Sequence, residues 1–222
     1  RFDEKDLTML DAYIYEGLRT PFGRHAGTLA KVRPDDLLGD VIKNVMKDSA
    51  FKPEQIEDVV VGCANQGGED SRCVARHASL VAGLPIETPG TVLQRNCASG
   101  LDALVYASRA VTCDEGDVFI VGGVESMSRA PFVMPKAESA FSRNNAVYDT
   151  TIGWRFVNKR MKEQYGVDSM PETAENVAID YKIEREAQDL MALSSQIKTA
   201  AAQKAGHFAR EIVAVHIPQR KG

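Results

Sequence analysis

Along the first 125 residues, the spacing of apolar residues alternates between continuous short runs and helical periodicity. Short β-branched runs bounded by glycine and proline are typical of buried strands. Between these runs, apolar residues recur at helical spacing and predict helices with one buried face. The predicted strands are 12–15, 56–61, 91–93 and 118–121, and the predicted helices begin at Pro34 and cover 71–82 and 101–110. This alternation of strands and helices predicts a parallel sheet covered by helices.

The pattern changes after residue 125. From Ser126 to about Met170 no period is sustained, and prolines and glycines interrupt the chain. A segment this long without regular structure is usually functional, for example a lid or an oligomer contact. Helices are expected again over 173–182 and 185–205, with Gly206 as a C-cap, and a strand is expected over 212–217.

These patterns predict an α/β chain with two domains. Residues 1–8 are charged and precede Met9, so we interpret them as a leader or an added expression segment. Residues 9–125 are expected to form the core domain, with its sheet and covering helices. Residues 126–222 are expected to form an α-rich loop domain that is incomplete.

Composition narrows the possible functions. Lys and Arg number 27 against 31 Asp and Glu, so the formal charge of −4 gives no general attraction to nucleic acid. No apolar run reaches the length of about 18–20 residues that crosses a bilayer, so no membrane partner is expected. The four cysteines, Cys63, Cys73, Cys97 and Cys113, are too few and too dispersed for a disulfide framework. They favour a reducing, cytoplasmic compartment, and with no pair at metal-ligand spacing we predict no metal.

Cys97 is the strongest candidate for chemistry. It follows a predicted strand and a tight turn, and it lies at the start of a predicted helix beside small residues. The free N–H groups and the positive end of a helix favour a thiolate at such a position. The alternative is that Cys97 is a small buried hydrophobic residue, as many free cysteines are.

Five segments of the chain resemble the thiolase family in the correct order. Residues 94–104, QRNCASGLDAL, resemble the acyl-enzyme motif, and residues 122–128, GGVESMS, resemble the family's second signature. The other three segments are 19–24, 62–70 and 170–178, so the resemblance covers nearly the whole chain from Met9. Residues 141–143 and 149–158 look most like the β-ketoadipyl-CoA thiolases within that family.

The resemblance implies a thiolase-like fold and an acyltransferase. Such an enzyme cleaves a 3-oxoacyl-CoA with free CoA, and its nucleophile carries the acyl group as a thioester. The resemblance to the β-ketoadipyl-CoA thiolases implies that this substrate is 3-oxoadipyl-CoA. By resemblance Cys97 is that nucleophile, and its own backbone N–H is one oxyanion donor. CoA is then a substrate and no cofactor is permanently bound. The resemblance also implies a homo-oligomer, either a dimer or a tetramer.

The resemblance assigns two coenzyme A contacts in the loop domain. Met170 would line the pantetheine channel, and Arg220 would lie near the nucleotide end. The alternatives are that Met170 is ordinary loop packing and that Arg220 belongs to a solvated tail. Ser169 stands where some family members have a histidine, which leaves the chemistry of the acyl pocket open.

The chain departs from the family in its acid–base groups. The activating histidine, the proton-transferring cysteine and an oxyanion asparagine belong to N-E-A-F, G-H-P and C-x-G-G-G motifs, which the 222 residues do not contain. We therefore expect the N-terminal portion of a thiolase, with the C-terminal half absent and the 222 residues inactive alone. An inactive CoA-binding or dimerising module is the alternative. A cysteine hydrolase that pairs Cys97 with His77 is the third reading.

Overall fold

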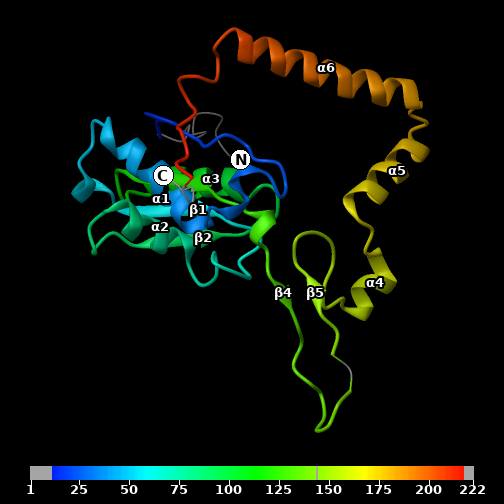
Figure 1. Ribbon diagram of the computed structural model, residues 1–222. Coiled ribbons are helices and arrows are strands. Elements are labelled where there is room, and N and C mark those ends of the chain that lie inside the picture. The colour runs from blue at the N-terminus through cyan, green and yellow to red at the C-terminus, as the bar shows by residue number, and fades with distance from the viewer. Residues whose placement is uncertain (1–11, 144, 218–222) are drawn as a thin grey trace, which may run out of the picture. The chain divides into compact units, whose positions relative to one another are not determined.

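The structure is a computed structural model that describes residues 12–143 and 145–217. Two compact units are present (Figure 1). One comprises the described residues up to Pro131 together with the segment from Val213, and the other is Phe132–Ile212. The expected leader over 1–8 and the proposed CoA contact Arg220 lie outside the described residues.

The first unit holds a three-stranded parallel sheet. Its elements are η1 (Thr28–Lys31), α1 (Pro34–Lys47), η2 (Pro53–Gln55), β1 (Asp58–Gly62), α2 (Val74–Ala82), β2 (Gly90–Leu93), α3 (Ser99–Thr112), β3 (Phe119–Gly123) and η3 (Met127–Arg129). The strand order is β2-β1-β3. Val60 of β1 pairs with Thr91 of β2 and with Val121 of β3. The carboxyl ends of all three strands therefore lie at the same edge of the sheet.

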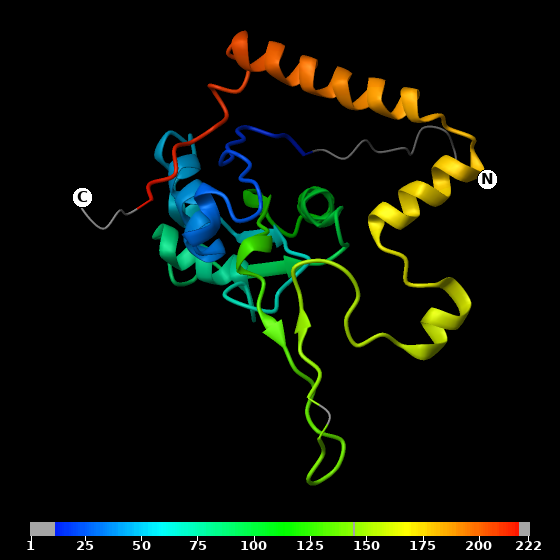
Figure 2. The same cartoon turned by 45° about the vertical axis from the view of Figure 1, so that its right-hand side comes forward.

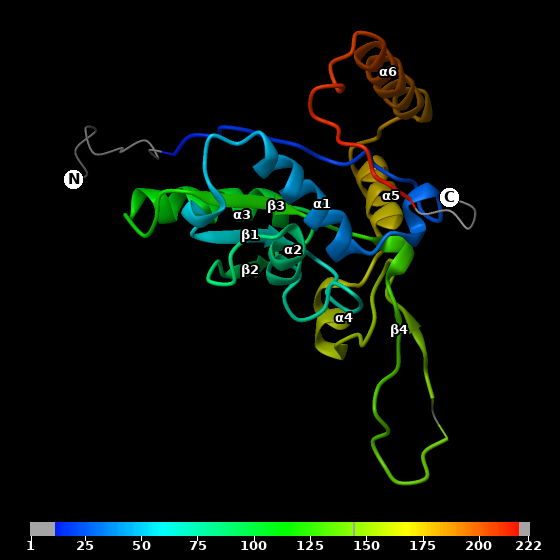
Figure 3. The ribbon, with the colours of Figure 1, turned by 60° about the vertical axis from the view of Figure 1, so that its left-hand side comes forward.

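The two faces of β1 are covered by different helices (Figures 2 and 3). Val59 and Val61 are fully buried with Ile42 of α1 and Val74 of α2, in one continuous apolar cluster. Val60 is also fully buried and points to the opposite face, because side chains alternate along a strand. That face is covered by α3, whose small residue Ala103 is buried. The α/β fold predicted from the sequence is confirmed.

Two expected strands are wrong. Residues 12–15 form no strand, and Tyr13, Ile14 and Tyr15 are largely exposed, because apolar residues make a strand only where a neighbouring strand pairs with them. Residues 212–217 likewise form no strand. A hydrogen bond of 2.9 Å from the Val213 N–H to the Arg19 carbonyl joins this segment to the start of the described chain.

Helix boundaries also differ from the expected ones by a few residues. The helix expected over 71–82 begins at Val74, the helix expected over 101–110 extends over Ser99–Thr112, and the helix expected from residue 173 begins at Met170. Gly206 does close α6, since its φ is +76° and the His207 N–H reaches back to the Ala202 carbonyl over 3.1 Å.

The second unit contains a hairpin and three helices. These elements are β4 (Phe132–Val133), β5 (Tyr148–Asp149), α4 (Lys159–Tyr165), α5 (Met170–Asp180) and α6 (Arg185–Lys204). The two strands pair antiparallel, and Tyr148 packs edge-to-face on Phe156 at 5.2 Å. None of the three helices buries a described side chain, and α6 exposes apolar residues such as Met191 and Ile197. The part of the chain that lacked a sequence period is therefore a hairpin followed by a short helix.

An ion network fastens the start of α1 to the loop after β1 and to η3. Arg33, the N-cap residue of α1, donates to both carboxylate oxygens of Asp35 (3.0 and 2.7 Å) and to Glu69 (3.2 Å). Arg129 also donates to Glu69 through two guanidinium nitrogens. The hydrogen bonds from Arg129, aided by the charge of Arg33, lower the pKa of Glu69 against the opposing effect of desolvation.

This network predicts a pH dependence of stability. Ionised Glu69 stabilises the fold fully at pH values above 4.5, the ordinary pKa of a glutamate. Because its pKa is lower in the folded protein, this contribution disappears only as the pH falls through that lowered pKa. We expect Glu69→Gln to lower the free energy of unfolding at pH 7 by about 1 kcal/mol and to lower it by less near pH 3. Urea unfolding at both pH values measures this, with Glu163→Gln on α4 as the control. An equal difference at both pH values contradicts the role given to the network.

Candidate active site

Cys97 lies in the turn that joins β2 to α3. The helix begins at Ser99 and has Ala98 as its N-cap residue, so Cys97 precedes the helix rather than opening it as the sequence suggested. Asn96, directly before it, has a φ of +47°, a sparsely populated conformation for this residue. The Cys97 side chain is exposed. A sharp strand-to-helix turn that presents an exposed thiol is a geometry suited to a nucleophile.

Hydrogen bonds hold this turn in one conformation. The Ser99 hydroxyl donates to the Asn96 carbonyl at 2.6 Å and accepts from the Arg95 N–H at 2.8 Å. The Arg95 guanidinium pairs with Asp102 in the first turn of α3 at 2.9 Å. In the described part of the chain neither the thiol nor the backbone N–H of Cys97 has a hydrogen-bond partner. Both groups are therefore free to meet a ligand.

Glycines allow the backbones of β1, β3 and the start of α3 to approach one another closely next to this turn. A Cβ at Gly62, the last residue of β1, would lie less than 3.0 Å from backbone atoms of Ser99 and Gly100. A Cβ at Gly123, the last residue of β3, would lie 3.5 Å from the Gly100 Cα. The start of α3 thus rests on the carboxyl ends of β1 and β3, which is the usual edge for ligand sites in parallel sheets.

A buried cysteine and two carboxylates lie at the same edge. The ligand atoms of Cys63, Asp70 and Glu125 are within 4.8 Å of one another and could together hold a metal ion, a group that spacing along the chain did not indicate. The Glu125 carboxylate accepts the N–H groups of Ala64 (2.9 Å) and Asn65 (3.1 Å), so it also fixes the loop after β1. Desolvation raises the pKa of Glu125, and these two donors oppose that rise.

Three of the four cysteines, Cys63, Cys97 and Cys113, should differ sharply in reactivity. Burial, with the charges of Glu125 and Asp70, raises the pKa of Cys63 to about 12, so its reactive thiolate is scarce at neutral pH. We expect iodoacetamide at pH 8 to modify the exposed Cys97 and Cys113 while Cys63 stays protected until the protein unfolds. Peptide mass mapping with and without urea measures this. Rapid labelling of Cys63 in the folded protein contradicts its placement.

The other sequence candidates lie in different places. His77 is on α2, and no described hydrogen bond joins it to Cys97, so the structure does not assemble the pair that a cysteine hydrolase needs. Met170 belongs to the second unit, where it is the first residue of α5 and is 71% exposed. Ser169 caps that helix, accepting the Glu172 N–H at 3.4 Å, while the Glu172 carboxylate accepts the Ser169 N–H at 2.7 Å.

Residues 12–222 match the thiolase N-terminal domain family, and the chain belongs to the thiolase family. Its relatives include the beta-ketoadipyl-CoA thiolase of Pseudomonas putida, which is 57% identical over 96% of this chain and 54% of that protein. The 3-oxoadipyl-CoA/3-oxo-5,6-dehydrosuberyl-CoA thiolase of Escherichia coli strain K12 is 56% identical over the same shares. The chain therefore spans about half the length of the curated relatives it matches.

A solved structure shows the same fold. The chain is similar to the acetyl-CoA acetyltransferase of Bacillus anthracis with a TM-score of 0.82 and 29% identity, over 93% of this chain and 51% of that one. The family and the thiolase-like fold expected from the sequence are thereby confirmed.

Proposed function

We propose that this chain is the nucleophile-bearing part of a thiolase that cleaves 3-oxoadipyl-CoA with CoA. The observation that carries the proposal is the exposed Cys97 thiol, held at the carboxyl end of the sheet within the segment that resembles the acyl-enzyme motif. The names of relatives 54–57% identical support the choice of a 3-oxoadipyl group. No described helix has the length and apolarity to span a bilayer. We propose a cytoplasmic enzyme with CoA as substrate.

The proposed chemistry has two acyl transfers. The Cys97 thiolate attacks the 3-oxo carbonyl carbon, the bond between that carbon and C2 breaks, and C2 takes a proton to leave as acetyl-CoA. The thiol of a second CoA then attacks the acyl-Cys97 thioester and leaves with the succinyl group. The free N–H of Cys97 would stabilise the oxyanion in each step. We propose that the histidine and the second cysteine that move these protons are supplied by the other half of a complete thiolase.

The acyl group left on the protein tests this proposal. After incubation of the complete thiolase with 3-oxoadipyl-CoA, intact mass analysis should show a gain of about 100 Da on Cys97 for a succinyl group, and acetoacetyl-CoA should leave about 42 Da. CoA retained without any adduct indicates the non-catalytic CoA-binding module instead. An adduct that water removes without added CoA indicates a hydrolase. Either result overturns the proposed thiolase reaction.

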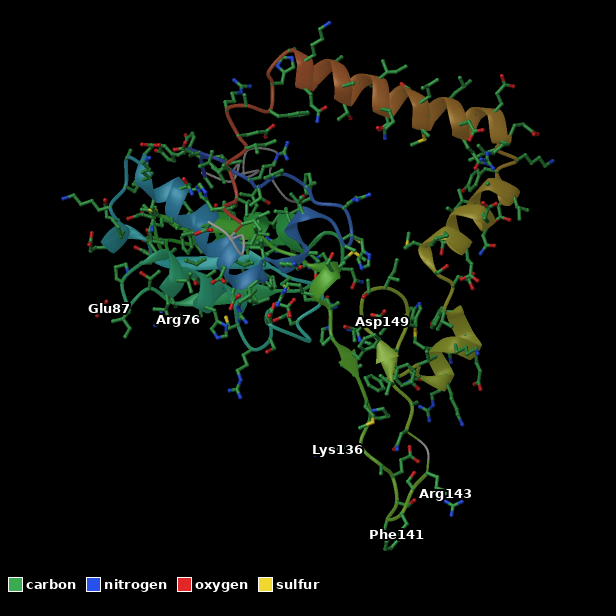
Figure 4. The ribbon with its side chains drawn as sticks, in the orientation of Figure 1. Arg76, Glu87, Lys136, Phe141, Arg143 and Asp149 are labelled. Carbon is green, nitrogen blue, oxygen red and sulfur yellow. The ribbon has the colours of Figure 1, made fainter. Side chains whose placement is uncertain are left out.

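We further propose a homo-oligomer in which the β4–β5 hairpin is a contact between copies. The tip of this hairpin carries Phe141, which is fully exposed, and Lys136 and Arg143 lie on the same loop between β4 and β5 (Figure 4). Along the hairpin Phe132 and Met134 are also more than half exposed. Monomeric proteins rarely leave an apolar surface of this kind uncovered, which favours burial against another chain.

Substitution of Phe141 in the hairpin should change the oligomeric state of the protein. We expect the wild-type protein to self-associate and Phe141→Asp to shift it toward the monomer, because a buried phenylalanine contributes about 2–3 kcal/mol to a contact. Light scattering after size exclusion measures the mass. Ser139→Asp adds the same charge to the same loop without removing apolar surface, and should change the mass much less. A monodisperse wild-type monomer overturns the proposed contact.

A further inference from the structure

We infer that the first unit contains a binding site for a small molecule with an oxyanion group, a carboxylate or a phosphate, in a cavity walled by Arg33, Arg72 and Arg129. This site is independent of the chemistry proposed for Cys97. The cavity is a depression that is largely open to solvent, with a volume of about 620 Å³, and it is also lined by Glu69, Ser71 and His77. Its size falls within the range of small-molecule sites, about 300–1,000 Å³.

The charges of the cavity wall favour an anion. Three arginines and one glutamate line it, whereas Asp35 and Asp36, which pair with Arg33 at 2.7 and 4.0 Å, are not among the lining residues. Guanidinium groups present planar pairs of N–H donors that match carboxylate and phosphate oxygens. A ligand with such a group therefore meets an excess of matching donors.

Of the three arginines, Arg72 is the one whose guanidinium is available to bind a ligand. Arg33 and Arg129 both bind Glu69, whereas Arg72 forms no ion pair with any described residue and its side chain is exposed. Its φ of +68° lies in the left-handed region, which non-glycine residues rarely adopt. An incoming oxyanion could therefore pair with the Arg72 guanidinium without displacing a described ion-pair partner.

Glu69 acts as an internal competitor for the ligand. Its two oxygens occupy donors of Arg33 and Arg129 that an incoming oxyanion could use. Removing its charge should therefore strengthen binding, whereas removing Arg72 should weaken it. One substitution should then raise the binding affinity and the other should lower it. Partial unfolding would lower the affinity of both variants, so it cannot explain this result.

Calorimetric titration with inorganic phosphate and with adipate, at one ionic strength, tests the site. We expect the wild-type protein to bind at least one of them, Arg72→Gln to bind about tenfold more weakly and Glu69→Gln to bind several-fold more tightly. Arg109→Gln, an exposed arginine at the end of α3, is the matched control and should bind as the wild type does. Thermal unfolding of each variant establishes that it is folded.

The two probes separate the possible ligands. Preference for phosphate identifies a phosphate ester as the ligand class, and preference for adipate identifies a dicarboxylic acid. Absence of binding of either probe up to about 10 mM overturns the inference. Equal binding by the wild type and Arg72→Gln overturns it as well, because the anion would then bind elsewhere on the surface.

Discussion

In the complete thiolase, Cys97→Ala is expected to abolish acylation of the protein by acetyl-CoA, a fall in rate on the order of 10³-fold or more. The reason is that Cys97 is the group placed to form the thioester: its thiol is exposed, and a free backbone N–H lies on the same residue. Intact mass measured over time gives the rate, and peptide mapping gives the position of the acetyl group.

Cys113→Ala is the matched control for this experiment. Cys113 is also exposed, but it is the C-cap residue at the opposite end of α3, so its replacement should leave acylation unchanged. Because the Cys97 side chain is exposed and makes no described hydrogen bond, Cys97→Ala should change stability by no more than about 0.5 kcal/mol. Acylation that persists in Cys97→Ala and maps to Cys113 contradicts the assignment and indicates unassisted thioester exchange.

The sheet and its covering helices could be predicted because their signal is local. The run from Val59 to Val61 is apolar at every position, and such a run is typical of a strand buried on both faces. The apolar run at Tyr13–Tyr15 looks similar but forms no strand, since pairing depends on a distant neighbour that the run itself does not specify. The β4–β5 hairpin was missed for the same reason, because two-residue strands joined by a long loop leave almost no period.

The candidate site also has parts that the sequence predicts and parts that it does not. The position of Cys97 between a strand and a helix is readable from the sequence, and resemblance to the thiolases adds a role for it. Glu125 accepts two backbone N–H groups from residues about sixty positions earlier in the chain. Nothing in the sequence around Glu125 predicts these hydrogen bonds. The network of Arg33, Glu69 and Arg129 spans three segments of the chain and was likewise missed. The GGVESMS segment, in which Glu125 lies, was the one available hint.

Gly62→Ala is expected to destabilise the protein by on the order of 3 kcal/mol and to slow acylation of Cys97. Gly62 ends β1, and an added Cβ would lie less than 3.0 Å from backbone atoms of Ser99 and Gly100. Backbone cannot move aside as a flexible side chain can, so either α3 shifts or β1 is distorted, and overpacking of this kind costs about 1–3 kcal/mol or more. The shift would displace the turn that presents Cys97.

Gly122→Ala is the matched control because it makes the same chemical change on the neighbouring strand β3. A Cβ at Gly122 would meet no atom within 4 Å, and neither glycine has a left-handed φ, so the two substitutions differ only in the space available. We expect Gly122→Ala to be neutral within about 0.5 kcal/mol in urea unfolding and to acylate at the wild-type rate. Equal stability of the two variants would mean that α3 can move away from β1 at little cost. A Gly62→Ala protein that is destabilised but acylates normally would separate the helix position from the chemistry of Cys97.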